Sequence, residues 1–262
     1  MAMTPLLVVA AVLGLAVGSF LNVVIYRVPR DQSLLRPGSR CTHCQAAIRP
    51  WHNVPVLSWL ILRGRCAHCH RGISPRYPLV EAGTALLFVA VTARFGVTPA
   101  LAAYLYLAAV AVALTMIDLD VRRLPNVIVL PSYLVGALLI MPAAAARAGW
   151  SSAARGLVAM AALTAFYLAL RFLYPGGMGL GDVKLAGLLG LYLGWLGWNS
   201  VWIGTFSGFL LGGLVGAVLL VTRRADRKTA IPFGPFMLAG AMLALFIAGP
   251  ITTWYGSLLT AT

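Results

Sequence analysis

The first long apolar stretch of the chain covers residues 4–26 and reads TPLLVVAAVLGLAVGSFLNVVIY. Its 23 positions contain no charged side chain, and a helix of about 20 apolar residues crosses the hydrocarbon core of a bilayer. The stretch lacks a basic leading segment and a clear small-residue cleavage site, so we expect a retained membrane span rather than a signal peptide. Gly14, Gly18 and Ser19 have the spacing of small residues that lets two membrane helices pack closely.

Composition extends this interpretation to the whole chain. Of its 262 residues, 61% are hydrophobic and 10% are charged, and the mean hydropathy is +0.90. Soluble domains have roughly 45–50% apolar and about 25% charged residues. Because no soluble fold buries so much apolar surface, the composition excludes a soluble globular protein, a disordered chain, a coiled coil and a secreted disulfide-rich miniprotein.

Further uncharged stretches predict an all-α polytopic membrane protein with about eight transmembrane helices. A polar, basic segment between the first two helices carries all four cysteines and all four histidines, and we expect it to form a small cytoplasmic zinc-ribbon-like domain. The predicted division is a first helix (1–29), a zinc-binding domain (30–77) and a seven-helix membrane domain (78–262). The predicted spans are residues 4–26, 78–95, 99–118, 124–142 and 153–173, a hairpin of two helices within 185–222, and residues 232–255.

Lysine and arginine residues set the expected orientation. With eight spans, all but three of the 20 basic residues (Arg94, Arg147 and Arg155) lie on the side that holds the cysteine-rich segment. Basic residues accumulate in cytoplasmic loops, so this side is predicted to be cytoplasmic, with both termini outside. The net charge of +14 is therefore mainly a signal of topology, and nucleic acid is not needed as a partner to explain it.

The four cysteines stand as two pairs, Cys41-Thr-His-Cys44 and Cys66-Ala-His-Cys69. Two such knuckles can supply four thiolates to one tetrahedral zinc ion. A site with four cysteine ligands has no open coordination position, so this zinc is expected to be structural rather than catalytic. Two alternatives stay open: four free or redox-active thiols, and replacement of one ligand by a histidine from within a knuckle.

Asp118 and Asp182 each stand where a long apolar span meets a cytoplasmic segment. Ionisable groups at membrane depth are costly and usually functional. Two carboxyl groups at one membrane face can share a proton and activate a water molecule, as in aspartyl proteases. Gly179 and Gly181 remove side chains beside Asp182, which would let an extended peptide approach. A purely structural interpretation is also open, with Asp118 paired to Arg122 and Asp182 capping a helix.

These features occur in a fixed order with several other motifs. The ordered set comprises the two cysteine knuckles and the segments Gly18–Pro29, Ser74–Glu81, Asp118–Asn126, Gly179–Lys184 and Ile231–Phe236. In this set the chain resembles the type IV prepilin leader peptidases, which are GxGD-type membrane aspartyl proteases of bacteria. The resemblance covers nearly the whole chain.

The resemblance implies an activity and its partners. The substrates would be type IV pilus prepilins and type II secretion pseudopilins, cut after a glycine at the cytoplasmic face of the bacterial inner membrane. Asp118 and Asp182 would be catalytic, with Gly179, Gly181 and Lys184 in support. Many family members also N-methylate the new amino terminus with S-adenosylmethionine, and the zinc domain is associated with these bifunctional members.

Several assignments remain open at this stage. Asp120 stands two residues from Asp118, and the distance to the Leu-Pro-Asn motif favours Asp118 as the catalytic residue. Glu81 either binds the basic end or the amino terminus of the substrate, or simply pairs with Arg76. Lys184 would neutralise a carboxylate or a phospholipid headgroup.

The main alternative function is an ion- or proton-coupled membrane transporter. Such proteins also use carboxylates within the membrane and helices broken by glycine and proline. A transporter predicts inverted internal repeats, which the sequence does not show, and it leaves the cysteine knuckles without explanation.

Overall fold

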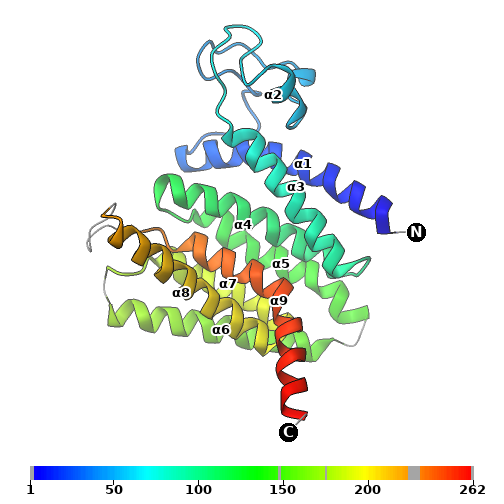
Figure 1. Ribbon diagram of the computed structural model, residues 1–262, viewed down its shortest axis with the longest axis vertical. Coiled ribbons are helices and arrows are strands. Elements are labelled where there is room, and N and C mark those ends of the chain that lie inside the picture. Colours follow the sequence, from blue (N-terminus) through cyan, green and yellow to red (C-terminus); the bar gives the residue numbers. More distant parts are fainter. Residues whose placement is uncertain (1–2, 147–148, 175, 224–230, 261–262) are drawn as a thin grey trace. The chain divides into compact units, whose positions relative to one another are not determined.

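Helices make up most of the chain in the computed structural model, which describes residues 3–146, 149–174, 176–223 and 231–260, without the side chains of residues 255–260. Within these ranges there is no strand, and two isolated β-bridges lie in the cysteine-rich segment. Figure 1 shows the helices in chain order. They are α1 (Met3–Arg27), α2 (Leu57–Ile61), α3 (Arg76–Phe95), α4 (Leu101–Val121), α5 (Asn126–Ala146), α6 (Trp150–Leu173), α7 (Leu180–Leu196), α8 (Trp198–Val221) and α9 (Gly234–Thr260), with short 3₁₀ turns at Val28–Arg30 and Pro50–His52.

The all-α membrane fold predicted from the sequence is confirmed. In the described ranges, seven helices have the length and apolar composition of a membrane span: α1, α3, α4, α5, α6, α8 and α9. The helix expected as the sixth span, α7, has only 17 residues. Arg147 and most of the predicted cytoplasmic segment 223–231 lie outside the described residues.

The start of α7 differs from the prediction. The predicted helical hairpin begins at residue 185, after the charged residues Asp182 and Lys184, but the helix begins at Leu180. Gly179 is its N-cap, and the Asp182 side chain accepts a hydrogen bond from the Gly179 N–H at 3.0 Å. A charged residue in the first turn thus stabilises the helix instead of excluding it. The turn after α7 is at Gly197, whose φ of 144° suits glycine.

The chain divides into two compact units, Met1–Ala113 and Leu114–Thr262. In the first unit, α1 and α3 pack side by side along much of their length. A Cβ atom at Gly14 would stand 2.6 Å from the Cα of Ala85, and one at Gly18 would stand 2.7 Å from the Cα of Glu81. The small residues predicted to allow close helix packing therefore do so.

In the second unit, α7 is the central helix and packs against α5, α6, α8 and α9. Nearly every residue from Val183 to Gly194 is buried. Its closest neighbour is α6: a Cβ atom at Gly190 would stand 2.6 Å from the carbonyl oxygen of Ala159. The glycine therefore lets the backbones of the two helices approach closely at this point.

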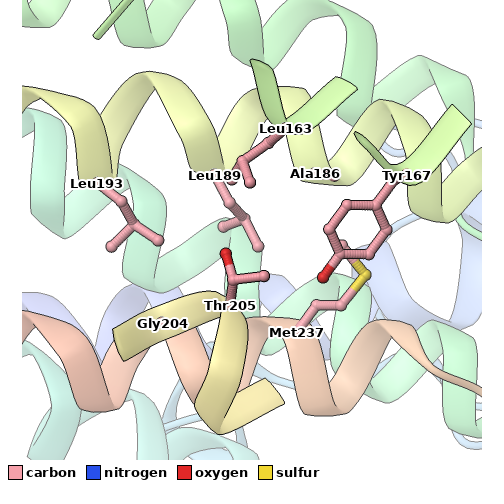
Figure 2. Close-up of a pocket in the computed structure, with 8 residues that line it drawn as sticks. All are labelled: Leu163, Tyr167, Ala186, Leu189, Leu193, Gly204, Thr205 and Met237. Atoms are coloured by element: carbon pink, nitrogen blue, oxygen red, sulfur yellow. The ribbon is translucent and has the colours of Figure 1, made fainter. Parts of the chain in front are cut away.

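A small cavity lies between α6, α7, α8 and α9, and Figure 2 shows the eight residues around it. Its volume is about 10 Å³, which is room for about one water molecule. The lining includes Tyr167 and Thr205 but is otherwise apolar. This cavity is therefore a packing gap and not a pathway for a solute.

Candidate functional site

The four cysteines of the first unit form one cluster. Their sulfur atoms all lie within 4.8 Å of one another, and the Sγ atoms of Cys41 and Cys69 are 3.8 Å apart. An isolated β-bridge closes each knuckle, between Arg40 and Ala47 in the first and between Arg65 and Gly72 in the second. The fold thus brings together the two Cys-x-x-Cys pairs, which are separated along the chain.

This geometry suits a metal ion. Four thiolates at about 2.3 Å from a tetrahedral zinc ion have sulfur–sulfur distances of about 3.8 Å. Backbone N–H groups of Cys44 and His43 lower the pKa of the Cys41 thiol to about 6, and those of Cys69 and His68 lower the pKa of Cys66. Metal ligation requires thiolates, so the backbone prepares these two cysteines for it. Among the described residues, no histidine belongs to the cluster.

Asp118 lies in the last turn of α4 and in the second unit. Its side chain is only 4% exposed, whereas that of Asp120 is exposed. The backbone N–H of Gly234, at the start of α9, donates a hydrogen bond to the Asp118 carboxyl group. A Cβ atom at position 234 would stand 2.7 Å from the Asp118 Oδ2, so the glycine is needed for this approach.

Asp182 lies in the first turn of α7 and is half-buried. Its hydrogen bond with the Gly179 N–H shows that it does cap a helix, as the structural interpretation proposed. Between Asp118 and Arg122 there is a main-chain contact: the Arg122 N–H donates a hydrogen bond to the Asp118 carbonyl oxygen at 2.9 Å, at the end of α4. Capping uses the Oδ2 atom of Asp182.

The structure brings the two carboxyl groups together. Asp182 is close enough to Asp118 for an appreciable electrostatic repulsion between them. The two residues are 64 positions apart in the sequence, and they meet because the ends of α4, α7 and α9 that carry them and Gly234 converge in the second unit. Two carboxyl groups that act on each other's charge can share one proton.

Contacts between the two aspartate segments hold this arrangement. The Lys184 Nζ donates a hydrogen bond to the Asn126 Oδ1 at 2.9 Å, a partner that the sequence did not suggest beside the carboxylate or the phospholipid headgroup. A Cβ atom at Gly181 would stand 3.0 Å from the Cβ of Leu124. Gly181 therefore allows the Leu-Pro-Asn segment to pack against α7, a reason different from the expected approach of a substrate.

Some neighbours of the pair were not assigned a role from the sequence. Tyr167 of α6 is buried, and it lies close enough to Asp182 for an electrostatic interaction between the two side chains. Arg171 donates a hydrogen bond to the Met178 carbonyl at 2.7 Å and orders the segment before α7. Gly234 and Asn126 lie within the motifs of the ordered set, so the sequence pointed to a functional role for them. Tyr167 and Arg171 lie in an apolar helix outside these motifs, and no sequence pattern singled them out.

Glu81 belongs to the first unit. It is 8% exposed, and its Oε2 accepts a hydrogen bond from the Val56 N–H at 2.7 Å. Ser19 and Asn22 of α1 also hydrogen-bond to it. These partners join the cysteine-rich segment to the helix pair through Glu81.

Comparisons with known proteins agree with the motif pattern. Residues 12–95 match the bacterial peptidase A24 N-terminal domain, and residues 105–261 match the type IV leader peptidase family. A prepilin leader peptidase/N-methyltransferase of Pseudomonas putida is 39% identical over 90% of this chain and 88% of its own. The protein of the same name from Stutzerimonas stutzeri is 37% identical over 94% of this chain and 92% of its own.

No solved structure shows a significant match. Nothing in these comparisons supports the transporter alternative. One family model covers more than half of the chain, and the relatives align with nearly all of it. The resemblance inferred from the motifs is thereby confirmed, and the chain belongs to the type IV leader peptidase family.

Proposed function

We propose that the protein is a membrane aspartyl endopeptidase that removes the leader peptide of type IV prepilins and type II secretion pseudopilins. The family membership and the names of the relatives support the reaction and its substrates. The observation that carries the mechanism is the meeting of Asp118 and Asp182 in one unit, within reach of each other's charge. Two neighbouring carboxyl groups can act as the general acid and the general base of peptide hydrolysis.

The proposed reaction uses the two groups in opposite protonation states. The ionised carboxylate takes a proton from a water molecule, and the oxygen of this water attacks the carbonyl carbon of the scissile peptide. The protonated carboxyl group donates its proton to the carbonyl oxygen. Collapse of the tetrahedral intermediate breaks the C–N bond, and the amine leaves with a proton from the pair. The Gly234 N–H and the Gly179 N–H hold the carboxyl groups in place.

A second activity, N-methylation of the new amino terminus, is part of the proposal because the relatives carry it in their names. S-adenosylmethionine would supply the methyl group, leaving S-adenosylhomocysteine and a proton. The cysteine cluster would hold one structural zinc ion and fold residues 30–77 as a domain. We further propose the inner membrane as location, with both termini outside and the aspartates on the cytoplasmic side, because basic residues concentrate there.

The central experiment replaces each aspartate with its near-isosteric amide. Detergent-solubilised Asp118→Asn and Asp182→Asn proteins are incubated with a purified prepilin, and mass spectrometry measures loss of the leader. We expect each variant to lose at least about 10³-fold in cleavage rate, because the acid–base function is removed while the shape is kept. The exposed Asp120→Asn variant is the matched control and should cleave normally.

Membrane insertion and thermal unfolding of all three variants establish that the fold is retained. Normal cleavage by Asp118→Asn or Asp182→Asn would remove that residue from the mechanism. Loss in Asp120→Asn with retention in Asp118→Asn would move the role to Asp120.

A further inference from the structure

The short helix α2, in the cysteine-rich segment of the first unit, exposes apolar side chains and buries a polar one. Leu57, Leu60 and Ile61 are spaced three and four residues apart, so they lie on one face of the helix. These side chains are 56%, 57% and 78% exposed. Ser58, in contrast, is buried, and its hydroxyl donates a hydrogen bond to the Trp51 carbonyl oxygen at 3.0 Å. The helix is therefore turned the opposite way from a surface helix of a soluble domain.

Two exposed residues before α2 enlarge this apolar surface. The Ser58 Oγ accepts a hydrogen bond from the Val54 N–H at 3.0 Å, and with its bond to Trp51 it ties both residues to the helix. On its other side, the Trp59 Nε1 donates a hydrogen bond to the Ile73 carbonyl oxygen at 3.0 Å, which fixes the orientation of α2. The exposed apolar side chains form what we call the α2 patch: Trp51, Val54, Leu57, Leu60 and Ile61. Exposed patches of this kind mark contacts with a protein or a membrane.

The α2 patch begins beside α1 and not beyond its end, as Figure 1 shows for α2. Val56, the residue before α2, donates a hydrogen bond from its N–H to the Glu81 Oε2 at 2.7 Å, and the Ser19 hydroxyl hydrogen-bonds to the same carboxyl group. Ser19 and Arg27, the first charged residue of α1, are eight positions apart, which is about 12 Å along the helix.

This distance places the start of α2 at the level of the lipid. The headgroup layer on one side of a bilayer is roughly 5–8 Å thick, which is less than the distance of about 12 Å along α1. Even with Arg27 at the outer edge of that layer, Ser19 and Glu81 reach the hydrocarbon. Since α1 and α3 both have the length and composition of membrane spans, the α2 patch continues the lipid-facing surface of this helix pair.

The charges around the patch fit an anionic surface. Between Asp31 and Glu81 the sequence has seven arginines and no acidic residue. The Arg49 Cζ lies 5.6 Å from the centroid of the Trp51 ring, and Arg63 is exposed directly after α2. Exposed tryptophan and leucine beside arginine are typical of a surface that lies in the membrane interface, where arginines meet anionic headgroups.

We propose that the α2 patch docks on the bilayer, with Leu57, Leu60 and Ile61 among the acyl chains and with Arg49 and Arg63 at the phosphates of anionic lipids. The cysteine-rich segment is then held against the membrane by a surface of its own, in addition to its chain connections to α1 and α3. A second copy of the chain fits this patch less well, because it would bring two arginine-rich surfaces together. The proposal concerns attachment to lipid and does not rest on either enzymatic activity.

A photoactivatable lipid tests the docking. The full-length protein is reconstituted in nanodiscs of phosphatidylcholine and phosphatidylglycerol that include a lipid with a diazirine in its acyl chain. After irradiation, mass spectrometry maps the lipid adducts along the chain. We expect adducts on residues 51–61 as well as on α1, whereas residues 41–47, whose exposed side chains are mainly polar, give the background.

Ile61→Asp and Gly72→Asp form a matched pair of variants. Each adds one carboxylate at an exposed position of the cysteine-rich segment, and a Cβ atom at Gly72 meets no other atom within 4 Å. Only Ile61 belongs to the α2 patch. Because a carboxylate is costly among acyl chains, we expect Ile61→Asp to lower the adducts on residues 51–61 at least about threefold. Gly72→Asp should be labelled as the wild type is.

Metal content and thermal unfolding in detergent show whether each variant is folded, and Leu57→Asp replaces Ile61→Asp if the latter does not fold. A wild type whose residues 51–61 carry no more lipid than residues 41–47 overturns the proposal. Equal labelling of residues 51–61 in the wild type and in a folded patch variant does the same. A wild-type dimer that the patch variant separates would also overturn it, because a second copy would then cover the patch.

Discussion

At the scale of single residues, the hydrogen bond between Lys184 and Asn126 links the two segments that carry the aspartates. Lys184→Met removes this link, and Asn126→Ala removes it from the other side. Because small displacements of reacting groups cost up to about 10²-fold in rate, we expect each variant to lower the kcat for leader cleavage about tenfold or more, with KM little changed. Kinetic measurement on a synthetic prepilin tests this positioning role.

The double variant distinguishes positioning from general damage. If the two side chains act through one link, the combined loss should be no greater than either single loss. Asn199→Ala is the control, because it breaks a polar contact with Thr252 between α8 and α9, away from the aspartates. Fully additive losses, or an equal loss in the control, would contradict the assignment.

At the scale of helices, the contact between α6 and α7 depends on glycines. In Gly190→Ala the added methyl group would stand 2.6 Å from the Ala159 carbonyl oxygen and 2.8 Å from the Met160 Cα, so the helices must separate. Overpacking of this kind costs about 1–3 kcal/mol. We expect a clear fall in the thermal unfolding temperature in detergent and, because α7 carries Asp182, a parallel loss of cleavage.

The control for this helix contact is Gly213→Ala in α8, where an added Cβ meets no atom within 4 Å. Alanine is a better helix former than glycine by about 1 kcal/mol, so this variant should unfold at the same temperature or slightly higher. A similar fall in both variants would mean that glycine flexibility, and not close approach, matters at position 190.

At the scale of the whole molecule, the two units predict that the activities can be separated. Cys66→Ser with Cys69→Ser removes half of the cysteine cluster, and metal binding supplies much of the folding energy of a small domain. We expect metal content to fall from about one ion per chain to none, residues 30–77 to become sensitive to protease, and methylation to be lost. Cleavage should persist, because both aspartates belong to Leu114–Thr262. A wild-type protein purified without metal would contradict this prediction.

The sequence predicted most helices because lipid imposes a simple rule on them: an uncharged run of sufficient length becomes a span. The same rule misplaced the start of α7, where Asp182 and Lys184 find partners in Gly179 and Asn126. The cysteine cluster was predictable because ligand spacing is local. The approach of Gly234 to Asp118 was not, because it depends on how α4 and α9 pack, and no local pattern encodes that packing.

The short length of α7 has a consequence for how the enzyme meets its bilayer. At about 1.5 Å per residue, 17 residues extend about 25 Å, less than the roughly 30 Å thickness of the hydrocarbon. A helix facing lipid would answer this mismatch by thinning the membrane around it, but α7 is enclosed by four other helices. We expect the surrounding helices to tilt or shift with the membrane thickness, while α7 keeps its position among them. We therefore expect the position of Asp182, in the first turn of α7, to depend little on lipid composition, which would tilt or stretch an exposed helix.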